Sequence, residues 1–240
     1  MKKLVFSALV VPLVSGIAIA SEGKKDWKFH SELSYVKTSG NSKAETFAAK
    51  AEATKTVEKN RFTAKASGLY AKSDGSETAS RWYILGRWDR TITDRMFWFL
   101  QGDLLNDKFA GFQYRTVWLG GVGYDILKTK KHYLKGLASI GYAYQKYEEG
   151  GSDNYPTASI DLNYVWQILD NLKFKEDFNY QTSLSDMELF YVNSDTSLQV
   201  KINTHFSLGV GLRIAYQNTP PAENIKKTDT TFLTSLIIDY

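Results

Sequence analysis

The 240-residue chain has no cysteine, only four prolines and three histidines, and no long uncharged apolar run after residue 20. The absence of cysteine excludes a disulfide framework and every thiolate metal site. A spanning helix needs about 20 consecutive apolar residues, so the chain after residue 20 cannot cross a bilayer as a helix. If this part lies in a membrane, it must form a closed barrel, which pairs all backbone groups between strands.

The first twenty residues have the pattern of an export signal. Two lysines open the chain, Leu4–Ala20 carries no charge, and Ala18-Ile19-Ala20 has the small-x-small form of a cleavage site. Pro12 interrupts the apolar run, which is short for a spanning helix. We predict a cleaved signal peptide over residues 1–20 and one domain over residues 21–240; the alternative is an uncleaved N-terminal anchor. Cleavage would lower the net charge from +4 to +2, a balance that gives no reason to expect nucleic acid.

The dominant period of the remaining chain is two, which is typical of strands. The clearest run begins at Phe112, and its even-numbered side chains are mostly apolar: Phe112, Tyr114, Thr116, Trp118, Gly120, Val122, Tyr124 and Ile126. The intervening positions include Arg115 and Asp125. The chain is 14% aromatic and its mean hydropathy is −0.34. Both values fit a membrane barrel, in which lipid-facing and lumen-facing residues alternate.

Turn signals divide the chain into about twelve strands, many of them ten residues or longer. A tilted strand needs about 9–11 residues to cross a bilayer. Counted along the chain, the even connections are mostly tight, whereas several odd ones are longer or rich in glycine, notably 106–111, 149–153 and 218–227. Outer-membrane barrels have short periplasmic turns and longer external loops. We therefore predict an all-β fold, a transmembrane up-and-down antiparallel β-barrel in the outer membrane of a Gram-negative bacterium. The alternative is a soluble periplasmic β-barrel that binds an apolar ligand inside.

Alternation assigns a set of ionised side chains to the polar face of the barrel: Arg81, Arg87, Asp89, Asp103, Arg115, Asp125, Asp161, Asp177, Asp195, Lys201 and Arg213. One interpretation is a narrow water-filled pore whose charge preference these side chains would set. The other is that acids and bases pair across the lumen and plug it. Because both signs are present, we expect no strong ion selectivity.

Aromatic residues on the apolar face gather near the predicted turns: Trp27, Tyr35, Tyr70, Trp88, Tyr124, Tyr144, Trp166, Tyr180 and Tyr216. Amphipathic rings at strand ends are typical of the girdles that sit at headgroup depth; the alternative is core packing in a soluble sandwich. Lys226 and Lys227 could contact lipopolysaccharide or simply be solvated. We expect a monomer that contacts outer-membrane lipid and lipopolysaccharide.

Three segments and a glycine-rich strand resemble a known family. The segments are Thr38–Ser42, Glu77–Arg95 and Asp107–Arg115, the last containing Phe-Ala-Gly-x-x-Tyr-Arg, and the strand contains Gly120–Tyr124. Together they are similar to the YdiY-like family of salt-induced outer-membrane proteins, domain of unknown function 481, over essentially the whole chain after residue 20. The resemblance implies an outer-membrane barrel without an established biochemical activity. Tyr240 also resembles the aromatic last residue that the barrel-assembly machinery recognises.

Other functional classes find little support in the sequence. A lipid acyl hydrolase would need a serine nucleophile beside a histidine base, and we expect none of His30, His132 and His205 to suit a site facing outer-leaflet lipid. The acidic groups at 74–76 and 148–153 lack complete calcium-ligand spacing. The glycine-rich stretch 120–123 is not followed by a helix, as a dinucleotide-binding loop would be. We therefore predict no catalytic residue, no metal site and no cofactor.

Overall fold

The computed structural model describes residues 27–38 and 43–240, so the predicted signal peptide lies outside the described residues. Twelve antiparallel strands form a closed barrel in which sequence neighbours pair and β1 pairs with β12. The strands are β1 (Trp27–Thr38), β2 (Ala44–Val57), β3 (Asn60–Ser73), β4 (Ser76–Thr91), β5 (Met96–Asp107), β6 (Phe112–Lys128), β7 (His132–Tyr147), β8 (Ser152–Leu169), β9 (Leu172–Ser183), β10 (Phe190–Lys201), β11 (Phe206–Gln217) and β12 (Thr228–Asp239). The predicted fold class and the strand number are thus confirmed.

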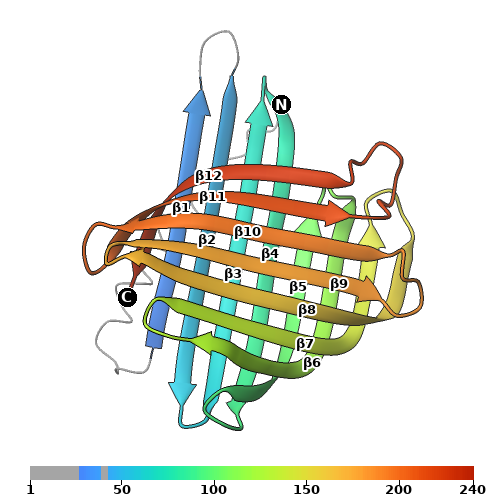
Figure 1. Ribbon diagram of the computed structural model, residues 1–240. Helices are drawn as coiled ribbons and strands as arrows, with labels where there is room; N and C mark the ends of the chain where they lie inside the picture. The colour runs from blue at the N-terminus through green and yellow to red at the C-terminus, as the bar shows by residue number, and fades with distance from the viewer. Residues whose placement is uncertain (1–26, 39–42) are drawn as a thin grey trace.

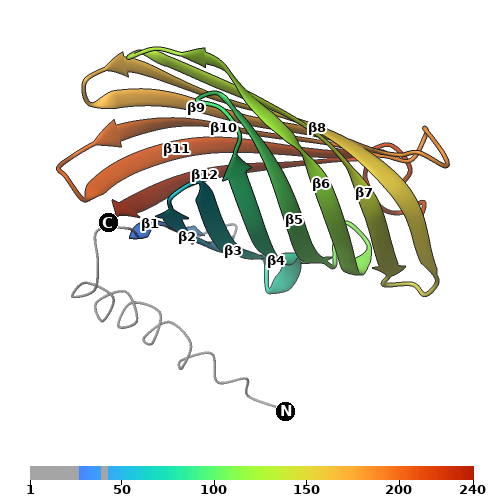
Figure 2. The ribbon, with the colours of Figure 1, turned by 90° about the horizontal axis from the view of Figure 1, so that it is seen from below.

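The strands are long and steeply inclined. Each contains 12 to 18 residues, more than the 9–11 that a tilted strand needs to cross a bilayer. In Figure 1 the strands β6–β12 of the front wall cross the strands β1–β5 of the back wall, and Figure 2 gives the view from below. No helix among the described residues is long and apolar enough to span a bilayer.

The two ends of the barrel differ in their connections. Short turns lie at 58–59, 92–95, 129–131, 170–171 and 202–205, at the same end as the start of β1 and the end of β12. The connections at the other end include the longest one, residues 218–227. Because short turns face the periplasm in outer-membrane barrels, we refer to the two ends as periplasmic and extracellular.

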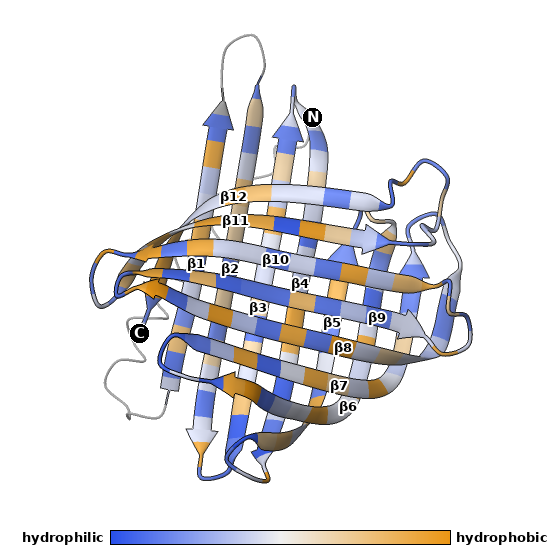
Figure 3. Cartoon of the chain, viewed as in Figure 1, coloured by the Kyte–Doolittle hydropathy of each residue, from blue (hydrophilic) through white to orange (hydrophobic). Residues whose placement is uncertain are grey.

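Side chains alternate between the lumen and the outer surface, as the sequence period predicts, except at Phe112, which an irregularity between Phe112 and Tyr114 turns inward, where it is buried against Tyr191. On β11, the outward residues Leu208 and Leu212 are 55% and 39% exposed, while the inward Ser207 is buried. Figure 3 shows the corresponding alternation of hydrophobic and hydrophilic residues along the strands. The outer surface therefore carries an apolar band. This contradicts the alternative of a soluble barrel with its apolar face turned inward, because such a band needs lipid to cover it.

The seam between β1 and β12 is much shorter than the other strand interfaces. Register pairs join only His30–Leu33 to Leu236–Asp239, and Phe29 and Tyr240 exchange two backbone hydrogen bonds of 2.9 Å below them. In contrast, β1 pairs with β2 along its whole length. Within the described residues, the extracellular part of β1 pairs with β2 alone and that of β12 with β11 alone.

Candidate functional site in the barrel lumen

The structure places the ionised residues expected on the polar face at inward positions of their strands. They are spread from one end of the lumen to the other: Arg81, Arg87, Asp89, Asp103, Arg115, Asp125, Asp161, Asp177, Asp195, Lys201 and Arg213. Their local environments differ sharply. Asp89 is 4% exposed, whereas the Asp195 side chain is 47% exposed. The lumen is therefore not uniformly lined, and its two walls need separate description.

One wall, formed by β5–β8, is closely packed. We call it the packed wall, and its buried apolar members are Phe97, Phe99, Val117, Leu119, Leu137, Ala143 and Tyr155. The Phe97 ring lies against Gly123, where a Cβ atom would come within 2.1 Å of it. A side chain at position 123 would therefore displace the ring, so glycine is required by this close approach.

The opposite wall, formed by β1–β3 and β9–β12, carries ionised side chains that keep access to water. We call it the hydrated wall. Its ion pairs join neighbouring strands: Lys50 Nζ to Glu32 Oε1 at 3.0 Å, Lys65 Nζ to Glu52 Oε2 at 3.1 Å, and Arg213 Nη1 to Asp195 Oδ2 at 3.6 Å. The side chains of these six residues are 23% to 47% exposed. Ion pairs this accessible to water contribute little to stability. Stability alone therefore does not explain why these three ion pairs line the hydrated wall.

Charges also interact across the lumen. Lys50 on β2 experiences the fields of Asp177 and Asp195 on the facing strands β9 and β10. Lys175 on β9 likewise experiences those of Lys50 and Glu32. Charged groups on β1, β2, β9 and β10 therefore influence one another across the interior of the barrel.

A compact charged cluster on β3 and β4 lies beside the packed wall, toward the periplasmic end of the barrel. Asp89 accepts hydrogen bonds from Arg61 Nε at 2.9 Å and from Arg87 Nε at 2.7 Å. The Arg87 guanidinium also lies 4.0 Å from the centre of the Phe99 ring. Nearby, the Tyr133 hydroxyl donates to Asp125 Oδ1 at 2.6 Å. Arg61 and Arg87 thus lie between the packed wall and the part of the lumen that is accessible to water.

A second group of side chains bridges the lumen in its extracellular half. Arg115 on β6 donates from Nη2 to Gln181 Oε1 on β9 at 2.9 Å, and its guanidinium lies 4.3 Å from the Tyr191 ring on β10. Tyr155 and Tyr191 both donate to Gln145 Oε1 at 3.0 Å. We call these five residues the cross-lumen bridge. These contacts join β6, β7 and β8 of the packed wall to β9 and β10 across the extracellular half of the lumen.

Remaining carboxylates of the predicted set have neutral or basic partners. Asp161 accepts from Asn179 Nδ2 at 2.8 Å and Asp177 from Asn163 Nδ2 at 2.7 Å. Asp103 accepts a longer hydrogen bond of 3.4 Å from Gln101. Arg81 lies 3.5 Å from Asp107. Hydrogen bonds and ion pairs between neighbouring strands therefore hold Asp161, Asp177 and Arg81 in place.

The extracellular connection 218–227 lies against the β5–β6 connection, which belongs to a distant part of the barrel rim. A Cβ atom added to Gly111, whose φ is +87°, would lie only 2.5 Å from the Pro221 side chain and 2.6 Å from that of Ile225. Gln217 Nε2 donates to the Ala110 carbonyl at 3.3 Å. The loop thus crosses part of the extracellular mouth. The sequence marked it as the longest connection, but nothing in the sequence identified its contact with Gly111.

The aromatic residues expected at the membrane interfaces point outward in two groups. Trp27, Trp88, Tyr124 and Trp166 lie toward the periplasmic end, and Tyr35, Tyr70, Tyr144, Tyr180 and Tyr216 toward the extracellular end. Other outward rings extend both groups, including Trp98, which packs edge-on against Trp88 at 4.7 Å. Tyr240 is 61% exposed and stacks on His205.

The histidines have partners that do not resemble a hydrolytic site. His30 lies between Asp239 Oδ1 at 2.6 Å and Glu32 Oε1 at 2.7 Å. His132 is within 2.8 Å of the Tyr164 hydroxyl, and His205 is 3.2 Å from the Asp239 carbonyl. None of these contacts involves a serine. Across the described residues, no group of three or more histidine, aspartate or glutamate side chains converges to hold a metal ion.

Comparisons with known proteins agree with this architecture. A family model described as "Protein of unknown function, DUF481" matches residues 31–240. The Escherichia coli K12 protein described as "Uncharacterized protein YdiY" is 26% identical over 216 residues, covering 90% of this chain and 84% of its own length. Among solved structures, the NanC porin is similar with a TM-score of 0.50 and 8% identity, covering 89% of this chain and 97% of that one. The KdgM porin gives a TM-score of 0.44 at 6% identity, covering 89% and 98%. At these identities the likeness to solved structures concerns the fold alone.

Proposed function

The chain belongs to the DUF481 family of proteins of unknown function, it is an outer-membrane β-barrel similar in fold to a porin, and we propose that it forms a narrow, water-filled pore for small polar solutes. Its twelve strands place it between eight-stranded barrels, which side chains fill, and 16-stranded porins, which enclose a wide channel. The observation that carries the proposal is the hydrated wall. Six ionised side chains keep a quarter to a half of their surface accessible to water although they point into the barrel.

The expected selectivity is weak because the hydrated wall alternates acids and bases. Charged side chains around a constriction set the charge preference of a pore. Here Lys50, Lys65 and Arg213 each pair with a carboxylate, so their fields largely cancel. The protein should therefore conduct both cations and anions.

Reversing one of these charges gives a direct test in planar bilayers. The Arg213→Glu variant would place two carboxylates together on the hydrated wall, and its reversal potential in a potassium chloride gradient should shift toward cation selectivity. Lys131→Glu, in an exposed periplasmic turn, makes the same change in net charge outside the lumen and should shift it much less. Absence of conductance steps from the folded wild-type protein would reject the pore.

The second candidate function is structural, and the cross-lumen bridge favours it. Arg115 joins β6 to β9 by its hydrogen bond to Gln181, and the Phe112 and Tyr191 rings meet at 6.2 Å. If these contacts extend to a complete plug, the barrel would stiffen the envelope without conducting. We further propose that the protein is a monomer surrounded by outer-membrane lipid and lipopolysaccharide, and that Tyr240 is the signal read by the barrel-assembly machinery.

A further inference from the structure

The outer surface of β2–β6 contains an apolar groove of about 690 Å³. Its floor is a row of the smallest side chains, which pair across neighbouring strands: Ala53 with Ala64, Ala64 with Gly86, and Gly86 with Gly102. No residue of this row extends beyond a methyl group. The volume lies within the roughly 300–1,000 Å³ typical of small-molecule sites.

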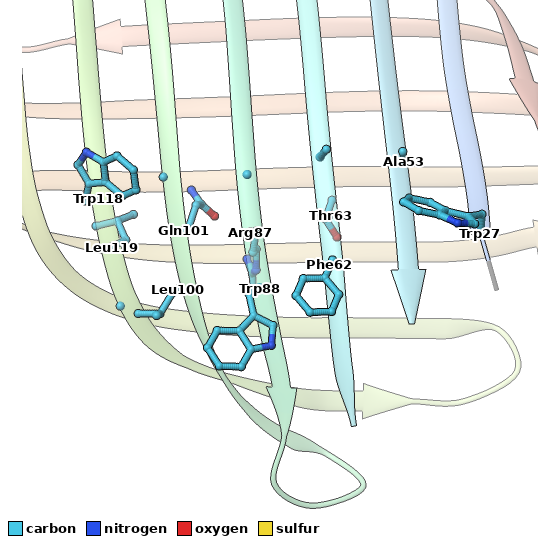
Figure 4. A pocket seen from close by; sticks show the side chains of 14 residues that line it. Trp27, Ala53, Phe62, Thr63, Arg87, Trp88, Leu100, Gln101, Trp118 and Leu119 are labelled. Carbon is cyan, nitrogen blue, oxygen red and sulfur yellow. The ribbon is translucent and has the colours of Figure 1, made fainter. Parts of the chain in front are cut away.

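Bulky side chains border this floor. The next row toward the periplasm places Phe62 opposite Trp88 and Trp88 opposite Leu100. Trp27 stands at one end and Trp118 at the other, as Figure 4 shows. The Trp118 ring lies on Gly102, where an added Cβ atom would be 2.6 Å from it. The groove is thus a depression in the lipid-facing surface that bulky side chains border on its periplasmic side and at both ends.

The groove has the depth of one bilayer leaflet. From β2 to β6 it crosses four strand spacings, about 19 Å at ~4.8 Å each. With strands tilted by about 45°, this corresponds to roughly 13 Å of depth, close to half of a ~30 Å hydrocarbon core. Its β2 end lies beside Trp27, the first residue of β1, and therefore near the periplasmic interface. Its occupant would come from the periplasmic leaflet.

Basic side chains stand where the groove meets the periplasmic interface. Lys55 faces outward from β2 two residues before its end, and its Nζ lies 5.3 Å from the centre of the Trp27 ring. Arg90 faces outward one residue before the end of β4 and is exposed. Within residues 27–38 and 43–240, no carboxylate lies within 4 Å of either cation. The acids at this rim, Glu58 and Asp94, belong to the turns.

We propose that the groove binds one acyl chain of an anionic glycerophospholipid from the periplasmic leaflet, with the phosphate beside Lys55 and Arg90. The apolar floor and aromatic borders suit a hydrocarbon chain, and the cations are complementary to the headgroup. A second copy of the chain fits less well, because a two-fold contact would bring the same patch, with its like charges, against itself. The site lies outside the lumen and does not depend on the pore.

The groove can be filled without disturbing the barrel. A Cβ atom added to Gly86 meets nothing within 4 Å, so Gly86→Leu should fold and occupy the floor. Gly68→Leu is the matched control: Gly68 also faces outward, on β3, and an added Cβ would meet only the Arg81 carbonyl at 3.8 Å. It does not line the groove. Heat-modifiable gel mobility verifies that each variant is folded.

The test uses the full mature chain in phosphatidylcholine vesicles that contain a small fraction of spin-labelled phosphatidylglycerol. Electron paramagnetic resonance should show a larger motionally restricted lipid component for the wild type and Gly68→Leu than for Gly86→Leu, whose remaining restricted lipid is that around the rest of the apolar band. Lys55→Gln should keep the component but abolish the preference for phosphatidylglycerol over spin-labelled phosphatidylcholine. Lys37→Gln, which also faces outward but at the extracellular end of β1, should retain that preference.

Three outcomes would overturn the proposal. Equal restricted components in Gly86→Leu and Gly68→Leu would show that lipid is not held in the groove. An unchanged headgroup preference in Lys55→Gln would remove the phosphate site. A cross-linked dimer that Gly86→Leu dissociates would assign the groove to a second copy of the chain.

Discussion

Replacing Phe99 by alanine should destabilise the barrel strongly, because this side chain is central to the packed wall. Phe99 is 1% exposed, its ring centre is 6.5 Å from that of Phe97, and the Arg87 guanidinium lies 4.0 Å above it. Truncating a buried phenylalanine typically costs about 3–5 kcal/mol, including the cavity left behind. The Arg87 contact adds about 0.5–2 kcal/mol when it is shielded from water. We therefore expect a loss of about 5 kcal/mol in the free energy of unfolding.

Equilibrium urea unfolding in lipid vesicles measures this loss through the fluorescence of the six tryptophans. Ser67→Ala provides the control on the hydrated wall, where Ser67 on β3 points into the lumen opposite Lys50. That substitution should change the free energy of unfolding by no more than about 0.5 kcal/mol. A loss below about 1 kcal/mol for Phe99→Ala would mean that water already occupies this wall, and the division of the lumen into two walls would be wrong.

Two further predictions concern the mouth and the seam. Gly111→Val should displace the loop at Pro221 and Ile225, because glycine there has a φ of +87° and no room for a Cβ atom; planar-bilayer conductance should rise, and an unchanged conductance would show that the loop does not obstruct the pore. At the seam, Ser34 and Ser235 are the next potential partners above the last register pair. The double variant Ser34→Cys/Ser235→Cys should form a disulfide only slowly under oxidation. Rapid and complete formation would show that β1 and β12 also pair at this position in the membrane-embedded protein.

The fold could be predicted from the sequence because one physical signal dominates it. In a strand, successive side chains face opposite sides, so the alternation of Trp118 and Leu212 with Arg115 and Arg213 was visible without coordinates. Turn residues then gave the strand count. The outward position of the aromatic rings follows from the same parity, and their two groups follow from where the turns lie.

The division of the lumen could not be predicted in this way. Parity assigns Phe97 and Phe99 to the inner face as surely as it assigns Asp103, but it does not tell which inner side chains meet across the barrel. The contact of Arg115 with Gln181 joins residues 66 positions apart and depends on the register of the intervening strands. The small residues of the outer groove could be assigned to the outer face from the sequence, because Ala53, Ala64, Gly86 and Gly102 all have outward parity. Recognising them as one row also required the register.

The most direct test of a conduit along one wall is the water accessibility of single cysteines, which the cysteine-free chain makes possible without background. Ser197→Cys lies on the hydrated wall, Ala143→Cys on the packed wall, and Leu198→Cys faces lipid. A membrane-impermeant thiol reagent should label position 197 rapidly and positions 143 and 198 scarcely at all. Labelling of position 143 as fast as position 197, or of 198 while 197 is spared, would contradict the account.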